Sequence, residues 1–280
     1  MKSKHFLLGA TLVALALASC GGRGGEGTDA SDADGITVFD VNQKLMTAEK
    51  DYRVDTDYGN IYLELFTSVQ WPEKMGGNDI GMLQDSILNF AYSDTTSTSV
   101  RDAIKKFLAD TSVVEDAKNV AEVDSLPADS MTYFSSVTVN VVDLDEEMVT
   151  YQVVSSSYLG GAHPLTTTHT FTYDFARGKV LDFANMFKAG VSTDSIMPVI
   201  TEALARQLSV PVRGLERAGI FVSQLTYPGQ PYIANNTLYF HYDPYEIGPY
   251  SLGAVDVAVY PYEVERYLQP AVAKLFDQGF

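Results

Sequence analysis

The chain has a single cysteine, Cys20, among its 280 residues. No intramolecular disulfide can therefore form, and stability must come from a packed core. Basic residues are also scarce, because 19 Lys and Arg stand against 36 Asp and Glu, a net charge of −17. An acidic chain repels nucleic acid and anionic lipid head groups and attracts cationic partners. This excludes nucleic acid as a partner, although solubility explains much of the same charge.

Several catalytic motifs are absent too. No P-loop supports nucleotide binding, and no G-x-S-x-G elbow accompanies the plentiful serines. The four histidines, His5, His163, His169 and His241, form no His-x-x-x-His pair. Four acids lie within residues 143–147, at the expected tip of a hairpin, where a solvated turn is favoured over a cation site. We predict no cofactor, no metal and no enzymatic activity.

The amino terminus has the pattern of a lipoprotein signal peptide. Lys2 and Lys4 precede the apolar run 6–18, which is too short to span a bilayer. The run closes on Leu17-Ala18-Ser19-Cys20, which resembles a bacterial lipobox at all four positions. The resemblance implies cleavage before Cys20 and lipidation of that residue. We favour it over an ordinary signal peptide because the chain uses cysteine nowhere else.

Cleavage would leave 36 acidic residues against 17 basic ones, a net charge of −19. Residues 20–35, the lipidated cysteine and a segment rich in Gly, Ser and Asp, predict a flexible tether. Several acyl chains together hold a protein stably on a membrane, which makes the membrane an expected partner. No Asp follows Cys20 to suggest inner-membrane retention, so we expect attachment to the outer membrane, facing the periplasm or the cell surface.

Hydrophobic patterns predict an α+β fold from residue 36 onward. In each half, strands are followed by helices and then by further strands, which favours antiparallel pairing over a βαβ series. We expect two small domains, residues 36–157 and residues 158–280, each with an antiparallel sheet packed by helices. Gly160, Gly161 and Pro164 interrupt the chain at the junction between them.

Individual elements follow from the same patterns. Strands are expected at 52–56, 60–67 (ended by Trp71-Pro72), 133–142, 148–155, 165–175, 238–243 and 254–260. Helices are expected at 79–92 with Asp79 as N-cap, 99–108, 193–208 and 262–276. In the strand 165–175, threonines alternate with aromatic residues and His169. This alternation places His169 on the core face, as a packed residue rather than a ligand.

Several segments in a fixed order resemble a known family. They are residues 158–163, an aromatic strand ending in a Gly-Lys turn and an Asp-Phe helix start, then residues 239–250 and 259–264. Together they resemble the domain of unknown function in the extracytoplasmic part of RsiV-type anti-sigma factors, which also occurs beside the catalytic domain of PdaC-type peptidoglycan deacetylases. The preceding half, about residues 54–157, is similar to the domain that usually accompanies it.

The resemblance implies a pair of α+β envelope domains, and in the RsiV-type branch it implies a receptor that binds lysozyme. The chain departs from both architectures. The sequence predicts no transmembrane helix, no cytoplasmic sigma-binding segment and no deacetylase catalytic domain. We therefore carry over binding, and neither regulation nor catalysis.

Three hypotheses for function stay open. The first is a non-catalytic envelope lipoprotein that binds a cationic protein such as lysozyme, with candidate binding residues His163, Tyr242, Tyr245, Glu246 and Tyr250. The second is a glycan- or peptidoglycan-binding accessory protein, in which tyrosine faces stack on sugar rings; two exposed coplanar rings would favour it. The third is a hydrolase that uses His163 with Asp243 or Glu246, although a histidine beside Gly-Gly and Pro more often fixes a turn.

Overall fold

The computed structural model describes residues 39–56, 59–124 and 132–276. The chain separates into the units Met1–Val38 and Phe39–Phe280. The predicted signal peptide, Cys20 and the predicted tether lie outside the described residues.

The described residues form strands and helices with the following bounds. The strands are β1 (Val41–Thr56), β2 (Gly59–Met75), β3 (Thr132–Leu144), β4 (Met148–Tyr158), β5 (Leu165–Asp174), β6 (Lys179–Val180), β7 (Tyr232–Ala234), β8 (Thr237–Tyr242) and β9 (Val255–Val259). The α-helices are α1 (Gly81–Tyr92), α2 (Val100–Ala109), α3 (Ser112–Asp124), α4 (Phe183–Met186), α5 (Thr193–Gln207), α6 (Pro261–Val264) and α7 (Pro270–Ala273).

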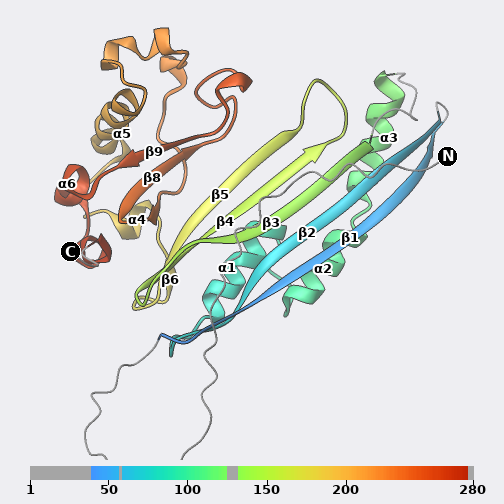
Figure 1. Cartoon of the computed structure of the whole chain (residues 1–280), viewed down its shortest axis with the longest axis horizontal. Coiled ribbons are helices and arrows are strands. Elements are labelled where there is room, and N and C mark those ends of the chain that lie inside the picture. The colour runs from blue at the N-terminus through green and yellow to red at the C-terminus, as the bar shows by residue number, and fades with distance from the viewer. Residues whose placement is uncertain (1–38, 57–58, 125–131, 277–280) are drawn as a thin grey trace, which may run out of the picture. The chain divides into compact units, whose positions relative to one another are not determined.

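The strands form two sheets, and Figure 1 labels all of their strands except β7. One has six strands in the order β1-β2-β3-β4-β5-β6, and the other has three in the order β7-β8-β9. Neighbouring strands pair antiparallel except β2 and β3, which pair in parallel. A parallel pair needs a crossover, and α1, α2 and α3 occupy the connection between β2 and β3. The predicted α+β class is confirmed, and the parallel pair is the exception to the predicted antiparallel arrangement.

The first two strands are much longer than predicted. Trp71 and Pro72 do not end β2, which continues to Met75 beside β1. The pairing of β1 with β2 shifts register between Asn42 and Gln43, opposite this proline. A β-bulge leaves a residue of the strand unpaired, so it tolerates a proline, which has no N–H to donate. The prediction ended the strand too early because it treated Trp71-Pro72 as a strand terminus.

One hydrophobic core lies between the six-stranded sheet and helices α1 and α2. Both helices begin near the predicted residues: the Ser99 side chain caps α2, but Ile80 rather than Asp79 is the N-cap of α1. Asp79 instead accepts a hydrogen bond from the Gly81 N–H at 3.0 Å. The core includes Leu83, Ile87, Val139, Tyr151, Val153, Phe171, Tyr173 and Phe175. The predicted alternation of β5 is therefore confirmed, since its aromatic residues share this face.

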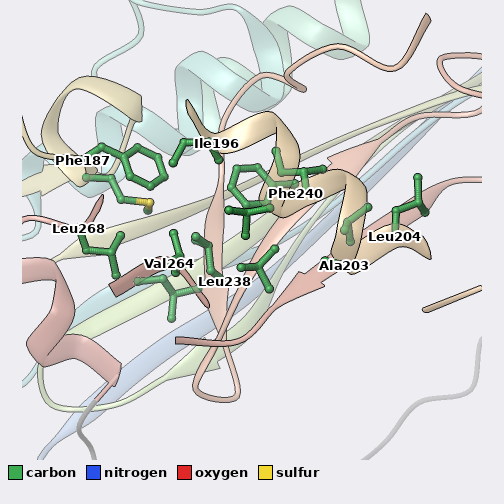
Figure 2. Packing of buried hydrophobic residues seen from close by; sticks show 14 of the residues in the cluster. Phe187, Ile196, Ala203, Leu204, Leu238, Phe240, Val264 and Leu268 are labelled. Carbon is green, nitrogen blue, oxygen red and sulfur yellow. The ribbon is translucent and has the colours of Figure 1, made fainter. Parts of the chain in front are cut away.

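A second core packs α5 against the three-stranded sheet. The predicted helix 193–208 is confirmed within one residue, and its residues Ile196, Ile200 and Leu204 are fully buried. They pack with side chains from β8 and from the carboxy-terminal segment, including Leu238, Phe240, Val264 and Leu268, as Figure 2 shows. Near the end of α5, Arg206 donates a hydrogen bond to the backbone carbonyl of Ala258 on β9.

The predicted closing helix 262–276 is wrong. The segment is divided into α6, a 3₁₀ turn over Glu265–Tyr267, α7 and a second 3₁₀ turn over Lys274–Phe276. Leu268 and Gln269 have extended backbone angles, with ψ of 146° and 143°. Pro270 explains the break, because proline disfavours helical angles in the residue before it. None of the described helices has the length and hydrophobicity needed to cross a bilayer.

Two buried threonines join the sheets. The Thr150 hydroxyl on β4 donates to the Ile233 carbonyl on β7 at 2.5 Å, and the Ile233 N–H donates to the Thr172 hydroxyl on β5 at 2.8 Å. The two hydroxyls also lie 2.8 Å apart and bond to each other. On the threonine face of β5, Thr172 is thus covered by β7. The predicted division at residue 158 lies at the end of β4, and β5 beyond it continues the same sheet.

Candidate functional site: an exposed histidine–tyrosine cluster

Two loops bring together residues that are far apart in the sequence. The first follows β4, where Gly160 and Gly161 have φ of 114° and 92°, values that favour glycine. The Tyr158 hydroxyl donates to the Gly161 carbonyl at 2.9 Å and closes this turn. The second loop follows β8, where Glu246 accepts a hydrogen bond from the Asp243 N–H at 2.7 Å. Each loop is therefore held by a bond of its own.

His163 from the first loop meets two tyrosines from the second. Its Nε2 lies 2.6 Å from the Tyr245 hydroxyl, and its ring stacks on Tyr250 with centroids 3.6 Å apart and planes within 5°. The two tyrosine rings lie 5.5 Å apart. Tyr245 is 51% exposed and Tyr250 is 39% exposed. We call His163, Tyr245 and Tyr250 the histidine–tyrosine cluster.

The backbone at Tyr245 adds to the unusual character of this cluster. Its φ of 75° lies in the left-handed region, where a residue with a Cβ is disfavoured by about 1–2 kcal/mol. Residues in strained backbone conformations gather at functional sites, where the surrounding structure holds them in place. Here the left-handed backbone of Tyr245 places its half-exposed ring at the surface, beside His163.

The structure brings three of the five candidate binding residues together. Glu246 is exposed and lies next to Tyr245 in the loop, where it bonds to the backbone. Tyr242 is different: it is only 2% exposed, and its hydroxyl donates to the Thr226 carbonyl at 2.8 Å. Tyr242 therefore anchors the base of the second loop and offers little surface to a ligand.

A second histidine network lies beside this loop and was not foreseen from the sequence. His241 on β8 contacts two carboxylates, with Nδ1 2.8 Å from Asp256 and Nε2 3.1 Å from Asp243. Asp243 also accepts the Thr168 N–H at 2.8 Å, and Asp256 accepts the Tyr232 hydroxyl at 3.0 Å. His241 and Asp256 are direct cross-strand partners in β8 and β9. Knowledge of that register would have revealed the contact.

The charge of His241 follows from its neighbours. Burial on its own lowers the pKa of the imidazole, but hydrogen bonds to Asp243 and Asp256 outweigh burial and raise the pKa to about 9. His241 is therefore a cation at neutral pH. Burial raises the pKa of Asp256, yet the bonded imidazolium outweighs that effect and holds the pKa below its usual value. This network fixes the base of the second loop.

His169 lies among aromatic rings on the core face of β5. Its ring centroid is 4.1 Å from that of Phe90, and its Nε2 has no hydrogen-bond partner among the described residues. Burial is the main influence on its pKa and lowers it, so the ring is neutral at pH 7. The interpretation of His169 as a packed residue agrees with these contacts.

The acid–base pair considered for His163 does not form in this arrangement. Within the described residues, the ring of His163 bonds to Tyr245. Asp243 bonds to His241 and to the Thr168 N–H, and Glu246 bonds to the Asp243 N–H.

Acidic side chains do not gather into a metal site either. Over the same described residues, no group of three or more His, Cys, Asp or Glu side chains is placed to hold a metal ion. The acids of the β3–β4 tip have structural contacts as well, since Asp143 accepts the Asn235 N–H at 2.7 Å and Asp145 accepts the Glu147 N–H.

Part of the chain, including most of the histidine–tyrosine cluster, is similar to a known protein family. Residues 184–262 match DUF3298, a family of proteins of unknown function. The DUF3298 match includes Tyr245, Glu246 and Tyr250, and His163 precedes it. A comparison with curated proteins found no match.

Solved structures of DUF3298 proteins have the same fold. One, from Bacteroides fragilis, has a TM-score of 0.69 at 15% identity and covers 86% of this chain and 100% of its own. Another, from Pseudomonas aeruginosa, has a TM-score of 0.57 at 15% identity and covers 83% of this chain and 96% of its own. At 15% identity, this similarity shows a shared fold and gives no evidence about function.

Proposed function

We propose that the chain is a non-catalytic, lipid-anchored protein of the bacterial cell envelope that binds a cationic protein through the histidine–tyrosine cluster. The observation that carries this proposal is an exposed, pre-arranged aromatic surface. Tyrosine supplies a large contact area with only two rotatable side-chain bonds, and it is enriched among the residues that dominate binding energy. Stacking on His163 and the hydrogen bond to it restrict both tyrosines before a partner arrives. Pre-arrangement lowers the entropy cost of association.

The net charge supports a basic partner. A chain of charge −17, or −19 after the proposed cleavage, accelerates encounter with a cationic protein by electrostatic attraction. Charge steers association, and the aromatic surface provides the affinity. Lysozyme is the first partner to test, because it is basic and because the RsiV-type resemblance implies a lysozyme receptor.

The contacts of His163 support a binding role over catalysis. A general base needs a free ring nitrogen within reach of a substrate proton. Here Nε2 lies at the Tyr245 hydroxyl and one ring face is covered by Tyr250. Of the carboxylates considered as partners, Asp243 accepts the Thr168 N–H of β5, and Glu246 accepts the Asp243 N–H within the loop. These groups build a surface rather than an acid–base pair.

The proposed anchor rests on the lipobox that ends at Cys20. We propose that lipidation there holds the protein at the outer membrane, with residues 21–35 as the tether. Replacing the thiol with Cys20→Ser prevents lipidation. The expected result is loss of the mass of the acyl chains from the intact protein, relative to the wild type. A wild-type protein that lacks this added mass would contradict the anchor.

The binding proposal is tested by biolayer interferometry of residues 36–280 against lysozyme, at about 20 mM and about 150 mM salt. The account predicts binding that weakens with salt and persists at the higher concentration, because contacts through aromatic groups are screened little. Binding confined to low salt would indicate charge attraction alone. That outcome, or no binding at either salt, would overturn lysozyme as the partner.

A second candidate function, glycan binding, is favoured by a different pair of tyrosines. Tyr260 and Tyr262 are 43% and 76% exposed, and their ring planes lie within 15° of each other. The sequence hypothesis is favoured by two exposed coplanar rings, and this exposed pair is nearly parallel. The pair shares no residue with the histidine–tyrosine cluster, so the two functions can be tested separately.

A further inference from the structure

A groove of about 810 Å³ lies between the β7–β8 turn and the carboxy-terminal segment. Its volume falls within the range of small-molecule sites, roughly 300–1,000 Å³. The residues that line it include Asn235, Asn236, Tyr260, Tyr262, Glu265 and Leu268. Tyr262 is 76% exposed, so core packing does not account for its position.

The aromatic side of this groove is held in place from behind. The centroids of the Tyr260 and Tyr262 rings are 5.8 Å apart. The Arg206 guanidinium lies over the Tyr260 ring, 4.9 Å from its centroid, and forms an ion pair with Glu263. Glu263 also accepts the Tyr260 N–H at 2.8 Å. Tyr260 is thus fixed to the body of the protein, and Tyr262 projects beyond it.

The other side of the groove offers free amides. Asn235 and Asn236 have φ of 47° and 56°, the left-handed values of a tight hairpin turn, and both are exposed. The bond from the Asn235 N–H to Asp143 fixes this turn. Neither side-chain amide has a hydrogen-bond partner within the described residues, although each offers donors and an acceptor.

We propose that this groove binds a neutral, β-1,4-linked sugar chain. Such a chain is extended and presents flat C–H faces, which stack on tyrosine rings, while its hydroxyls bond to amides of the kind that Asn235 and Asn236 expose. Glu265 on the wall and the net charge of −17 disfavour anionic sugars. Tyr262 is the stacking platform, and the two asparagines select for hydroxyl and acetamido groups.

This inference deepens the second proposed function and does not depend on the first. It assigns glycan binding to named residues, outside the histidine–tyrosine cluster. A failure of the site and a failure of the function therefore give different results. Sugar binding that is unchanged in Tyr262→Ala would overturn this site alone. Absence of sugar binding in the wild type would overturn both the site and the glycan-binding function.

The experiment is calorimetric titration of the purified chain with three neutral tetrasaccharides: an N-acetylglucosamine tetramer and cellotetraose, both β-1,4-linked, and maltotetraose, which is α-1,4-linked. We expect the β-linked tetramers to bind with Kd below about 1 mM, a range suited to one or two stacked rings. Maltotetraose, which is curved, is expected to bind at least tenfold more weakly. Equal binding of all three, or of none, would overturn the proposal.

Three variants locate the site. Tyr262→Ala is expected to weaken binding of the β-linked tetramers at least tenfold, and Asn235→Ala combined with Asn236→Ala about threefold to tenfold. Tyr62→Ala is the matched control, because Tyr62 is a 52% exposed tyrosine on β2 and outside the groove. It should leave binding within twofold. Thermal unfolding of each variant verifies the fold, and wild-type affinity in folded Tyr262→Ala would overturn the assignment.

Discussion

His163 and His241 contact the same loop of the molecule in opposite ways. His241 lies at the base of the loop, with its side chain 10% exposed, between the carboxylates of Asp243 and Asp256. His163 reaches the tip from another part of the chain and meets two half-exposed tyrosines. One histidine is a partly buried cation that links β8 to β9, and the other completes a surface. The rigid base is what allows a strained tip to hold its shape.

The largest effect on stability is expected from His241→Ala. Removing the imidazolium leaves two carboxylates facing one cavity without their cation, and breaking a partly buried charge network of this kind costs about 2–4 kcal/mol. Urea unfolding measures this loss. His163→Ala is the matched comparison, with an expected change below about 1 kcal/mol. Equal losses in the two variants would remove the distinction between the histidines.

The pH dependence of stability is the next largest effect. The pKa of His241 is raised in the folded state, to about 9 from an ordinary value near 6.5. Protonation therefore favours the folded state, so this contribution is fully present below about pH 6.5 and is lost as the pH rises through about 9. We expect the free energy of unfolding to fall by roughly 2 kcal/mol between pH 6.5 and pH 9.5, allowing for the partial exposure of Asp256.

Urea unfolding at a series of pH values measures this slope. His241→Gln retains hydrogen-bonding capacity without the titrating proton and should flatten the curve in this window. A slope in the His241→Gln protein as steep as in the wild type would show that another group titrates there.

The smallest effect on stability is expected at the tip of the loop. Tyr245→Gly relieves the left-handed backbone at φ 75° but loses the contacts with His163 and Tyr250. These contributions are each about 1 kcal/mol and opposite in sign, so the free energy of unfolding should change by less than about 1 kcal/mol. Thermal unfolding measures the change. A loss of 3 kcal/mol or more would mean that Tyr245 is structural, as Tyr242 is.

Local patterns predicted the elements with strong periodicity. The alternation of β5 and the spacing of Ile196, Ile200 and Leu204 in α5 gave the correct faces, because both depend only on the residues of one segment. The parallel pairing of β2 with β3 could not be predicted, since it depends on how three helices route the chain. The predicted helix 262–276 is interrupted because Pro270 disfavours helical backbone angles at Gln269.

The candidate site was predicted in its parts and not in its assembly. The sequence predicts Tyr245 and Tyr250 as possible binding residues, and it places His163 beside two glycines and a proline. Their meeting depends on a contact between residues 82 positions apart, which no local pattern encodes. The same reason explains why the His241–Asp256 pair was missed, because cross-strand register joins segments of different sequence position.

The central claim is that the histidine–tyrosine cluster is a protein-binding surface. The most direct measurement is the affinity of lysozyme for Tyr245→Ala, Tyr250→Ala and the control Tyr62→Ala, by biolayer interferometry at about 150 mM salt. Loss of a central tyrosine costs about 2 kcal/mol, so the account predicts about 30-fold weaker binding for the first two variants and less than twofold change for Tyr62→Ala. Wild-type affinity in both cluster variants, with their fold intact, would contradict it.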